Sequence, residues 1–265
     1  MVQEISPMPT AYFRFYAELN DFLLPHNKYK NNVCKYYGRQ SVKHLIESMG
    51  IPHTEIDLII INGSSVDFSY LVKDGDQVSV YPVFETMDIA SINHLRPAPL
   101  REVKFVLDVH LGRLAAYLRM LGLDAVYRND YDDDELADLS SAEKRILLTH
   151  DRGLLKRKQV THGFYIRSAN VRQQMLEVLK RFDLLTSIRP FSRCLRCNDT
   201  LQDTSKEEIT DQLLPGTRKN FHEFKVCPTC EQIYWKGAHY QHMQNLVDGW
   251  VKELTGNAKG EIKRV

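Results

Sequence analysis

The chain has 265 residues, of which 43% are hydrophobic and 26% are charged, a composition that is ordinary for a soluble globular protein. Its length exceeds that of a typical single domain and predicts two or three domains. The formal net charge of +1 gives no overall electrostatic reason for a nucleic-acid partner, and no apolar run is long enough for a membrane span.

Charge is distributed unevenly along the chain. Residues 1–100 carry 8 Lys and Arg against 11 Asp and Glu, whereas the remainder carries 27 against 23. This asymmetry favours an anionic partner for the C-terminal part. Residues 1–12 show no basic stretch followed by an apolar one, so no signal peptide is predicted and a cytoplasmic location is expected. In that reducing compartment, clustered cysteines bind metal more often than they form disulfides.

The first 90 residues contain short strand patterns and one helix pattern. Residues 1–9 are expected to be a loose leader. We predict a helix over 42–49, which Ser41 caps and Gly50 ends. The predicted strands cover residues 11–19, 33–38, 58–63, 66–70 and 77–84. We expect Cys34 to be a buried strand residue. The order of these elements predicts a compact α+β domain over residues 1–90.

Pro97 and Pro99 indicate a linker over residues 91–102. Beyond it, short apolar runs alternate with helix patterns, which predicts a parallel three-layer α/β sheet with right-handed crossovers over residues 103–188. The predicted strands are 105–107, 124–127, 146–149 and 163–167. The predicted helices are 111–121, which Gly122 ends, 133–143, and 169–182, which Ser168 caps.

Acidic residues stand where strands of this sheet end. Asp108 follows the run 105–107, and Asp151 follows the run 146–149. Ligands bind outside the carboxyl ends of strands in open α/β sheets, so the two acids should meet at one edge if their strands are close. A carboxylate from the acidic run 130–135 could join them. Such carboxylates repel one another unless a divalent cation is present, and oxygen-only sites suit Mg²⁺ or Mn²⁺.

Each of these acids also has a purely structural interpretation. An Asp at a strand–helix junction is often a helix cap, and an acidic run is often a solvated helix start that the macrodipole favours. Arg113 and Arg119 are also typical of the exposed face of an amphipathic helix. The basic stretch 156–158 is also typical of a solvated surface.

Two C-x₂-C knuckles, Cys194 with Cys197 and Cys227 with Cys230, are separated by 29 residues. Four thiolates at this spacing are the ligand set of a structural Zn²⁺ site, in which no coordination position remains for a reactive water. We therefore predict a zinc ribbon over residues 189–245 and a C-terminal tail over 246–265 that frays from about Thr255. Trp235 is more typical of the ribbon core than of a base-stacking platform, which is the alternative.

Several segments together resemble the Mut-seven C-terminal RNase domain, a PIN-type nuclease fold that carries a zinc ribbon. They are Asp108 with HLGRLAAYLRMLG, then DDDEL, RILLTHDRGLL, PFSRCLRCN and CPTCEQIYWKGAHYQHM. The resemblance covers residues 103–245. One departure is His150, where the family usually has Arg.

The N-terminal domain resembles the ubiquitin-like β-grasp domain that is often fused to this RNase domain. Its segment LVKDGDQVSVYPVF is similar to the sulfur-carrier branch of that fold. The carriers end in Gly-Gly, whereas this chain continues into residues 85–89 without such a pair. An interaction or packing module is therefore expected.

The resemblance implies metal-dependent cleavage of RNA. Asp108 and Asp151 would be the primary ligands of Mg²⁺ or Mn²⁺, and Asp133 or Asp134 would complete the site, with Asp133 preferred. The candidates for phosphate contact are Arg113, Arg119 and Arg152. The alternative is a non-catalytic RNA-binding adaptor whose β-grasp domain recruits a protein partner.

Overall fold

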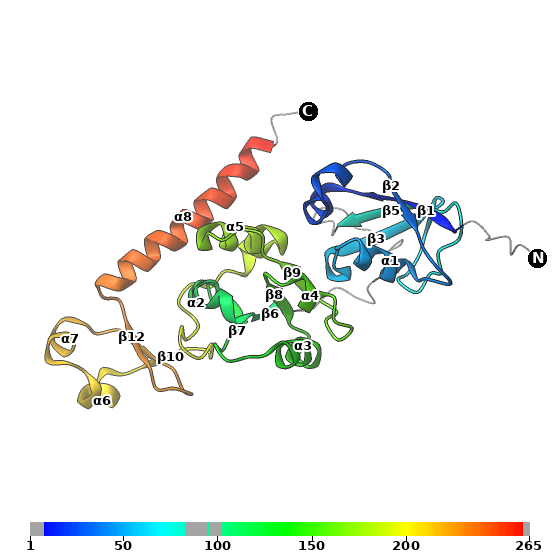
Figure 1. Ribbon diagram of the computed structural model, residues 1–265. Coiled ribbons are helices and arrows are strands. Elements are labelled where there is room, and N and C mark those ends of the chain that lie inside the picture. Colours follow the sequence, from blue (N-terminus) through cyan, green and yellow to red (C-terminus); the bar gives the residue numbers. More distant parts are fainter. Residues whose placement is uncertain (1–7, 83–94, 96–101, 262–265) are drawn as a thin grey trace, which may run out of the picture. The chain divides into compact units, whose positions relative to one another are not determined.

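The computed structural model describes residues 8–82, 95 and 102–261 (Figure 1). Most of the predicted leader, and most of the predicted linker over 91–102, lies outside these residues. The chain divides into two compact units: residues 1–101 with 137–165, and residues 102–136 with 166–265. Among the described residues, no helix combines the length and the apolar character needed to cross a bilayer.

The first unit begins with a mixed five-stranded sheet of order β2-β1-β5-β3-β4. In it β1 and β5 are parallel, and the other neighbouring strands are antiparallel. Helix α1 (Val42–Ser48) lies against the sheet (Figure 1), and the Ser41 hydroxyl caps it by accepting the His44 N–H. This arrangement is the predicted β-grasp domain. The strands are β1 (Thr10–Phe15), β2 (Asn32–Lys35), β3 (Ile56–Ile61), β4 (Ser64–Ser65) and β5 (Gln77–Pro82).

Two strand predictions in this domain are corrected by local side-chain chemistry. The first strand ends at Phe15, because the Asn20 side chain donates to the carbonyls of Phe15 and Ala17 and stabilises a 3₁₀ helix, Ala17–Phe22. The strand predicted over 66–70 is absent from the described residues, because the Asp67 carboxylate accepts the Ser69 N–H and forms a turn.

The four-stranded parallel sheet has the order β7-β6-β8-β9. In the second unit β6 pairs with β7, and in the first unit β8 pairs with β9. The predicted strands and helices are confirmed to within two residues at each end. The strands are β6 (Lys104–Leu107), β7 (Asp124–Val126), β8 (Ile146–Thr149) and β9 (Gly163–Tyr165). The helices are α2 (Gly112–Met120), α3 (Asp133–Ala142) and α5 (Val171–Arg181), and a short helix that was not predicted, α4 (Arg152–Leu155), follows β8.

The cap of α5 differs from the prediction. The Asn170 side chain accepts the N–H groups of Arg172 and Gln173, so Asn170 and not Ser168 is the N-cap. Ser168 instead accepts the Asn170 N–H and holds the capping residue in place. Both residue types are good caps, and the geometry of the turn selects between them.

The second unit continues into a three-stranded antiparallel sheet of order β10-β11-β12. Residues 189–237, which contain this sheet and the four clustered cysteines, are called the ribbon below. Its strands are β10 (Gln202–Thr204), β11 (Phe224–Val226) and β12 (Ile233–Trp235), and its helices are α6 (Lys206–Ile209) and α7 (Pro215–Asn220).

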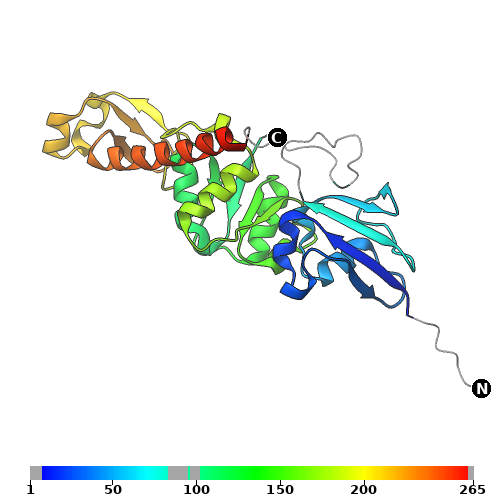
Figure 2. The ribbon, with the colours of Figure 1, turned by 90° about the horizontal axis from the view of Figure 1, so that it is seen from above.

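The last helix, α8, runs from Ala238 to Glu261 and lies beside α5 in two perpendicular views (Figures 1 and 2). Trp250 is buried, and its ring lies 5.1 Å from that of Tyr117 on α2. Arg172 of α5 forms a 2.8 Å ion pair with Glu253. The prediction that the tail over 246–265 frays from about Thr255 is therefore wrong as far as residue 261, because the chain is helical to that point.

Candidate functional site

Asp108 follows β6 directly and is only 8% exposed. Its Oδ1 accepts the His110 N–H at 3.2 Å, so the side chain caps the 3₁₀ turn Val109–Leu111 that leads into α2. The capping interpretation is thus confirmed for Asp108. Capping uses one oxygen of the carboxylate and does not exclude a second role.

Tyr127 fixes the turn after Asp108. Its hydroxyl donates to the Val109 carbonyl at 2.9 Å, and the ring packs against Gly112. A Cβ on Gly112 would lie 2.7 Å from the Tyr127 oxygen, so any larger residue would displace the ring. Gly112 therefore allows the close packing that orients the residues following Asp108.

Three of the acids in the run 130–135 have local structural partners. Asp130 forms a 2.7 Å ion pair with Arg128. Asp132 and Glu135 accept each other's backbone N–H groups, which is the reciprocal arrangement of a capping box at the start of α3. Asp133 and Asp134 are exposed residues of the first turn of this helix.

Asp151 lies in the first unit, at the start of α4. Its Oδ1 accepts the Gly153 N–H at 2.6 Å, and its own N–H donates to Thr149 Oγ1 at 2.9 Å. Asp151 is exposed. It is therefore an N-cap whose carboxylate is accessible to solvent. The neighbouring His150 ring meets Tyr165 edge-on, with 6.5 Å between the centroids.

Arg152 contacts the β-grasp domain. Its guanidinium lies 5.0 Å from the centroid of the Phe22 ring and 5.2 Å from that of Tyr165, and it donates to the Phe22 carbonyl at 3.2 Å. Nearby, Lys156 Nζ donates to the Glu47 carbonyl at 2.7 Å. These contacts give Arg152 a structural role that the sequence analysis did not anticipate.

Two further contacts join the same parts of the first unit. His53 Nε2 lies 2.9 Å from the Val160 carbonyl oxygen, and the Tyr165 N–H donates to the Glu55 carboxylate at 2.6 Å. His53 and Glu55 are both buried. The β-grasp domain thus holds the segment that begins with Asp151 by several buried or half-buried hydrogen bonds.

Arg119 and Arg113 lie in different environments on α2. Arg113 is exposed, as a phosphate contact requires. Arg119 is 4% exposed, and burial lowers the pKa of its guanidinium. It donates to four backbone carbonyls, at 2.8–3.5 Å, so a phosphate group has no access to it. We therefore no longer consider Arg119 a phosphate ligand. The acceptors are Ala125, Tyr127, Leu195 and Arg196.

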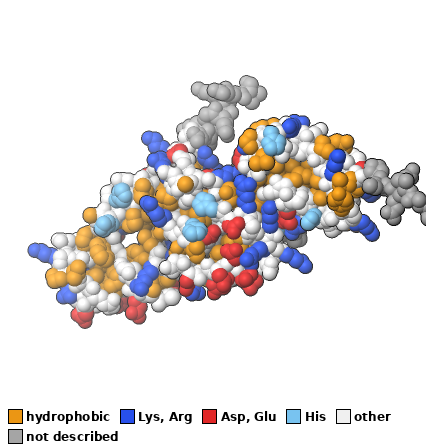
Figure 3. Space-filling model, viewed as in Figure 1, with side chains coloured by type: hydrophobic (Ala, Val, Ile, Leu, Met, Phe, Trp, Pro, Cys, Tyr) orange, Lys and Arg blue, Asp and Glu red, His pale blue; other side chains and the backbone are white. Residues whose placement is uncertain are grey.

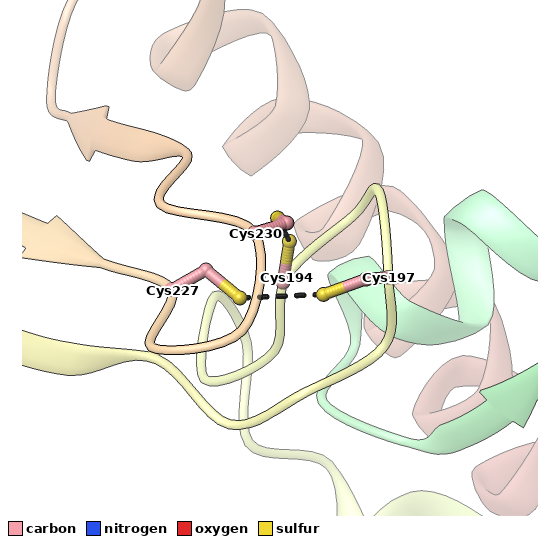
Figure 4. Close-up of side chains that lie close together, drawn as sticks. All are labelled: Cys194, Cys197, Cys227 and Cys230. Atoms are coloured by element: carbon pink, nitrogen blue, oxygen red, sulfur yellow. Dashed lines mark hydrogen bonds between the residues drawn. The ribbon is translucent and has the colours of Figure 1, made fainter.

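The structure brings together the four cysteines of the ribbon (Figure 4). All four sulfurs lie within 4.8 Å of one another. Cys194 and Cys230 are 3.5 Å apart, and Cys197 and Cys227 are 3.3 Å apart. A tetrahedral Zn²⁺ with sulfurs at about 2.3 Å requires sulfur–sulfur distances of about 3.8 Å. The donor set and its spacing therefore fit a zinc ion.

Tyr234 supports this cluster. Its hydroxyl lies 3.2 Å from Cys194 Sγ and accepts the Leu195 N–H at 3.0 Å. Burial acts to raise the pKa of Cys194, but hydrogen bonds from Tyr234 and from the Cys197 and Arg196 amides outweigh it and lower the pKa to about 6. Burial raises the pKa of Cys197 to about 12. The sequence analysis missed Tyr234, although it lies on the strand that follows the second knuckle.

Of the predicted catalytic acids, Asp108, Asp133 and Asp134 belong to the second unit, whereas Asp151 belongs to the first. Trp235 is 39% exposed, which contradicts the prediction that it lies in the ribbon core. The ribbon core is formed around the cysteines with Leu201, and around Ile209, Leu213 and Phe224.

Comparison with protein-family models gives two matches. Residues 103–247, more than half of the chain, match the model described as the Mut7-C RNAse domain, and residues 8–88 match the model described as Mut7-C ubiquitin. Neither the curated proteins nor the solved structures with which the chain was compared include a match.

Proposed function

The chain belongs to the Mut7-C RNAse domain family, and we propose that it is a ribonuclease that cleaves RNA phosphodiester bonds with the help of a divalent cation. The observation that carries this proposal is the position of Asp108, a nearly buried carboxylate at the carboxyl end of β6 within the matched domain. Asp151 lies two residues after the end of β8, and parallel strands of one sheet present their carboxyl ends at the same edge.

The chemistry of these acids fits Mg²⁺ or Mn²⁺. Carboxylate oxygens are the hard ligands that both ions prefer. In the proposal Asp108 and Asp151 hold the cation, and Asp133 or Asp134, both exposed on the first turn of α3, completes the set. When bound, the cation supplies positive charge that activates a water and stabilises the charge that develops on the phosphate. The exposed Arg113 remains the candidate for phosphate contact.

We further propose that Cys194, Cys197, Cys227 and Cys230 bind a structural Zn²⁺ and that the ribbon aids RNA binding. All five cysteines of the chain are free of disulfides, as zinc ligation requires, and this suits a reducing location such as the cytoplasm.

The test is cleavage of a panel of labelled RNAs by the full chain with Mg²⁺, with Mn²⁺ or with EDTA. Because EDTA also removes zinc from thiolates, the divalent ion is added back together with stoichiometric Zn²⁺. Asp108→Asn and Asp151→Asn should each reduce cleavage by about a hundredfold or more, since each removes a cation ligand. RNA binding should stay equal or tighten slightly because a negative charge near phosphate is lost. Wild-type cleavage by both variants would refute the proposal.

The alternative is an RNA-binding adaptor without catalysis. It would use the β-grasp domain to recruit a protein, and one observation favours a partner surface there. β2 is an edge strand of the sheet, and Val33 and the neighbouring Tyr37 are 62% and 75% exposed. RNA binding without cleavage under every metal condition would favour the adaptor.

A further inference from the structure

The ribbon and the first turns of α8 line a cavity of about 620 Å³ that is open to solvent on one side. Its wall is mainly apolar, and its volume is within the range of about 300–1,000 Å³ that is typical of ligand sites. None of the acids proposed for catalysis lines it. The aromatic and apolar side chains of the wall include Phe191, Phe224, Tyr234, Trp235, Tyr240 and Met243.

Two features of this wall suit a flat ligand. Phe191 and Tyr240 form a ring pair with centroids 4.6 Å apart. Trp235 is 39% exposed, and the Phe221 ring lies 6.4 Å from it. Gly237 leaves room beside the indole, because a Cβ there would lie 2.9 Å from Trp235 Nε1. The indole is thus held within the wall while part of its surface stays open.

Cations lie around the same cavity. Arg193 donates hydrogen bonds to the carbonyls of Gly122 and Asn198, so its guanidinium already has partners within the protein and is a poor phosphate ligand. Lys225 and Lys236 are different, because each forms a single exposed ion pair, at 3.2 Å with Asp203 and at 2.6 Å with Glu223. Exposed pairs of this kind stabilise a protein little. Both lysines can therefore exchange a carboxylate for a phosphate at small cost.

Hydrophobic side chains gather over the ribbon, with Lys and Arg side chains between them (Figure 3). Aromatic faces next to lysines form the surface on which proteins bind unpaired nucleotides, because bases stack on the rings while phosphates pair with the cations. A duplex keeps its bases stacked inside, so it cannot offer one to a cavity.

We propose that this cavity binds an unpaired nucleobase of single-stranded RNA, stacked on Trp235, with the flanking phosphates on Lys225 and Lys236. The proposal deepens the proposed function and rests on it for the identity of the ligand as RNA. It defines the substrate class as single-stranded and places a second contact with the RNA outside the cleavage site.

The test uses the full chain loaded with Zn²⁺ and carrying Asp108→Asn and Asp151→Asn, so that the RNA stays intact. Affinity for a labelled ten-nucleotide oligoadenylate is measured by fluorescence anisotropy. Trp235→Ala should weaken binding by about 5- to 100-fold, which corresponds to the loss of one stacked base. Trp235→Phe should keep most of the affinity. The same oligomer without its bases, and a blunt duplex of the same length, should both bind more weakly.

Leu214→Ala is the matched control, because Leu214 is an apolar ribbon residue that is 74% exposed and does not line the cavity. It should bind RNA like the parent protein. Zinc content and circular dichroism of each variant exclude loss of the ribbon fold. A second measurement uses Trp250→Phe, which leaves Trp235 as the single tryptophan, whose emission a stacked base should quench.

Unchanged affinity in Trp235→Ala, or equal binding of the duplex or the baseless oligomer, overturns the proposal. Quenching of Trp235 by an acetylated trileucine peptide but not by RNA would assign the cavity to apolar peptides and also overturns it. The two proposals fail separately. Binding that depends on Trp235 without any cleavage by the wild-type chain refutes the nuclease alone, whereas cleavage that Trp235→Ala leaves intact in rate and affinity refutes the base site alone.

Discussion

Arg119 and Arg152 each join distant parts of the chain, but by different chemistry. Arg119 is buried and donates to four backbone carbonyls, two of which belong to the Cys194–Cys197 knuckle. Arg152 is half-buried and joins the β-grasp domain through two aromatic rings and one carbonyl. The first junction therefore requires the knuckle to keep its shape, which depends on the metal if the cysteines bind Zn²⁺ as proposed. The second requires only packing.

Metal removal should break the first junction and spare the second, which is the largest effect that we expect. Structural Zn²⁺ contributes apparent binding energies of about 10 kcal/mol or more to folding. Cys197→Ser, or a chelator, should therefore increase hydrogen exchange throughout residues 190–240 and leave residues 10–82 protected. Metal analysis should find one Zn²⁺ per chain in protein purified without chelator. A purified protein without zinc would contradict the ribbon assignment.

Arg119→Ala tests the first junction directly. It removes the donor from one buried and three partly buried carbonyls, and each buried group left unpaired costs about 1–3 kcal/mol, so the loss should be about 3 kcal/mol. Urea unfolding monitored by Trp250 fluorescence should report it, because Trp250 packs against Tyr117 on the same helix. Arg119→Lys should recover little, since an ammonium cannot reproduce the planar fork of donors. A loss below 1 kcal/mol would show that water replaces the guanidinium.

Arg152→Ala should have a smaller effect, of about 1–2 kcal/mol, because two half-exposed cation–π contacts and one hydrogen bond are lost. Hydrogen exchange should increase in residues 151–157 and around Phe22, with the ribbon unchanged. Arg152→Lys is the matched comparison, since it keeps the charge and loses the planar stacking. If Arg152→Ala weakened RNA binding but left exchange unchanged, Arg152 would be a phosphate ligand after all.

Arg113→Ala should have the smallest effect on stability, within about 0.5 kcal/mol, because the side chain is exposed. Its effect should appear in RNA binding. Loss of one phosphate contact should make the negative slope of log affinity against log salt concentration less steep by about 0.7 for single-stranded RNA. An unchanged slope would remove Arg113 from the RNA contacts and leave the lysines of the ribbon as the better candidates.

Local signals account for what the sequence predicted well. The Cys spacing located the metal cluster, and Ser41 and Gly122 located helix ends, since each acts on its own neighbouring backbone. Gly122 has a φ of 82°, and a Cβ there would lie 2.1 Å from the Arg189 carbonyl. The acids at the ends of β6 and β8 were also local predictions, and their convergence stays a prediction.

The sequence analysis missed contacts between residues that lie far apart in the sequence. No residue close to Arg119 in the sequence indicates that its side chain contacts the Leu195 carbonyl. In the same way, no residue close to Arg152 indicates its contact with the Phe22 ring. The predicted tail is a different case, because Tyr240, Met243, Val247 and Trp250 recur at spacings of three, four and three, which is a helix signal. The charged and glycine-containing end of the chain obscured that signal.

The position of Trp250 near the end of the chain has a consequence for biosynthesis. The buried residues of the β-grasp core all lie within residues 11–80, whereas Tyr117 acquires its Trp250 partner 168 residues after residue 82. At about 5–20 residues per second, a ribosome needs roughly 8–34 s to add them. We therefore expect nascent chains stalled near residue 130 to show a protease-resistant β-grasp domain; full digestion of that segment would contradict this. From the addition of Tyr117 until that of Trp250, the face of α2 that carries Tyr117 stays uncovered and accessible to chaperones.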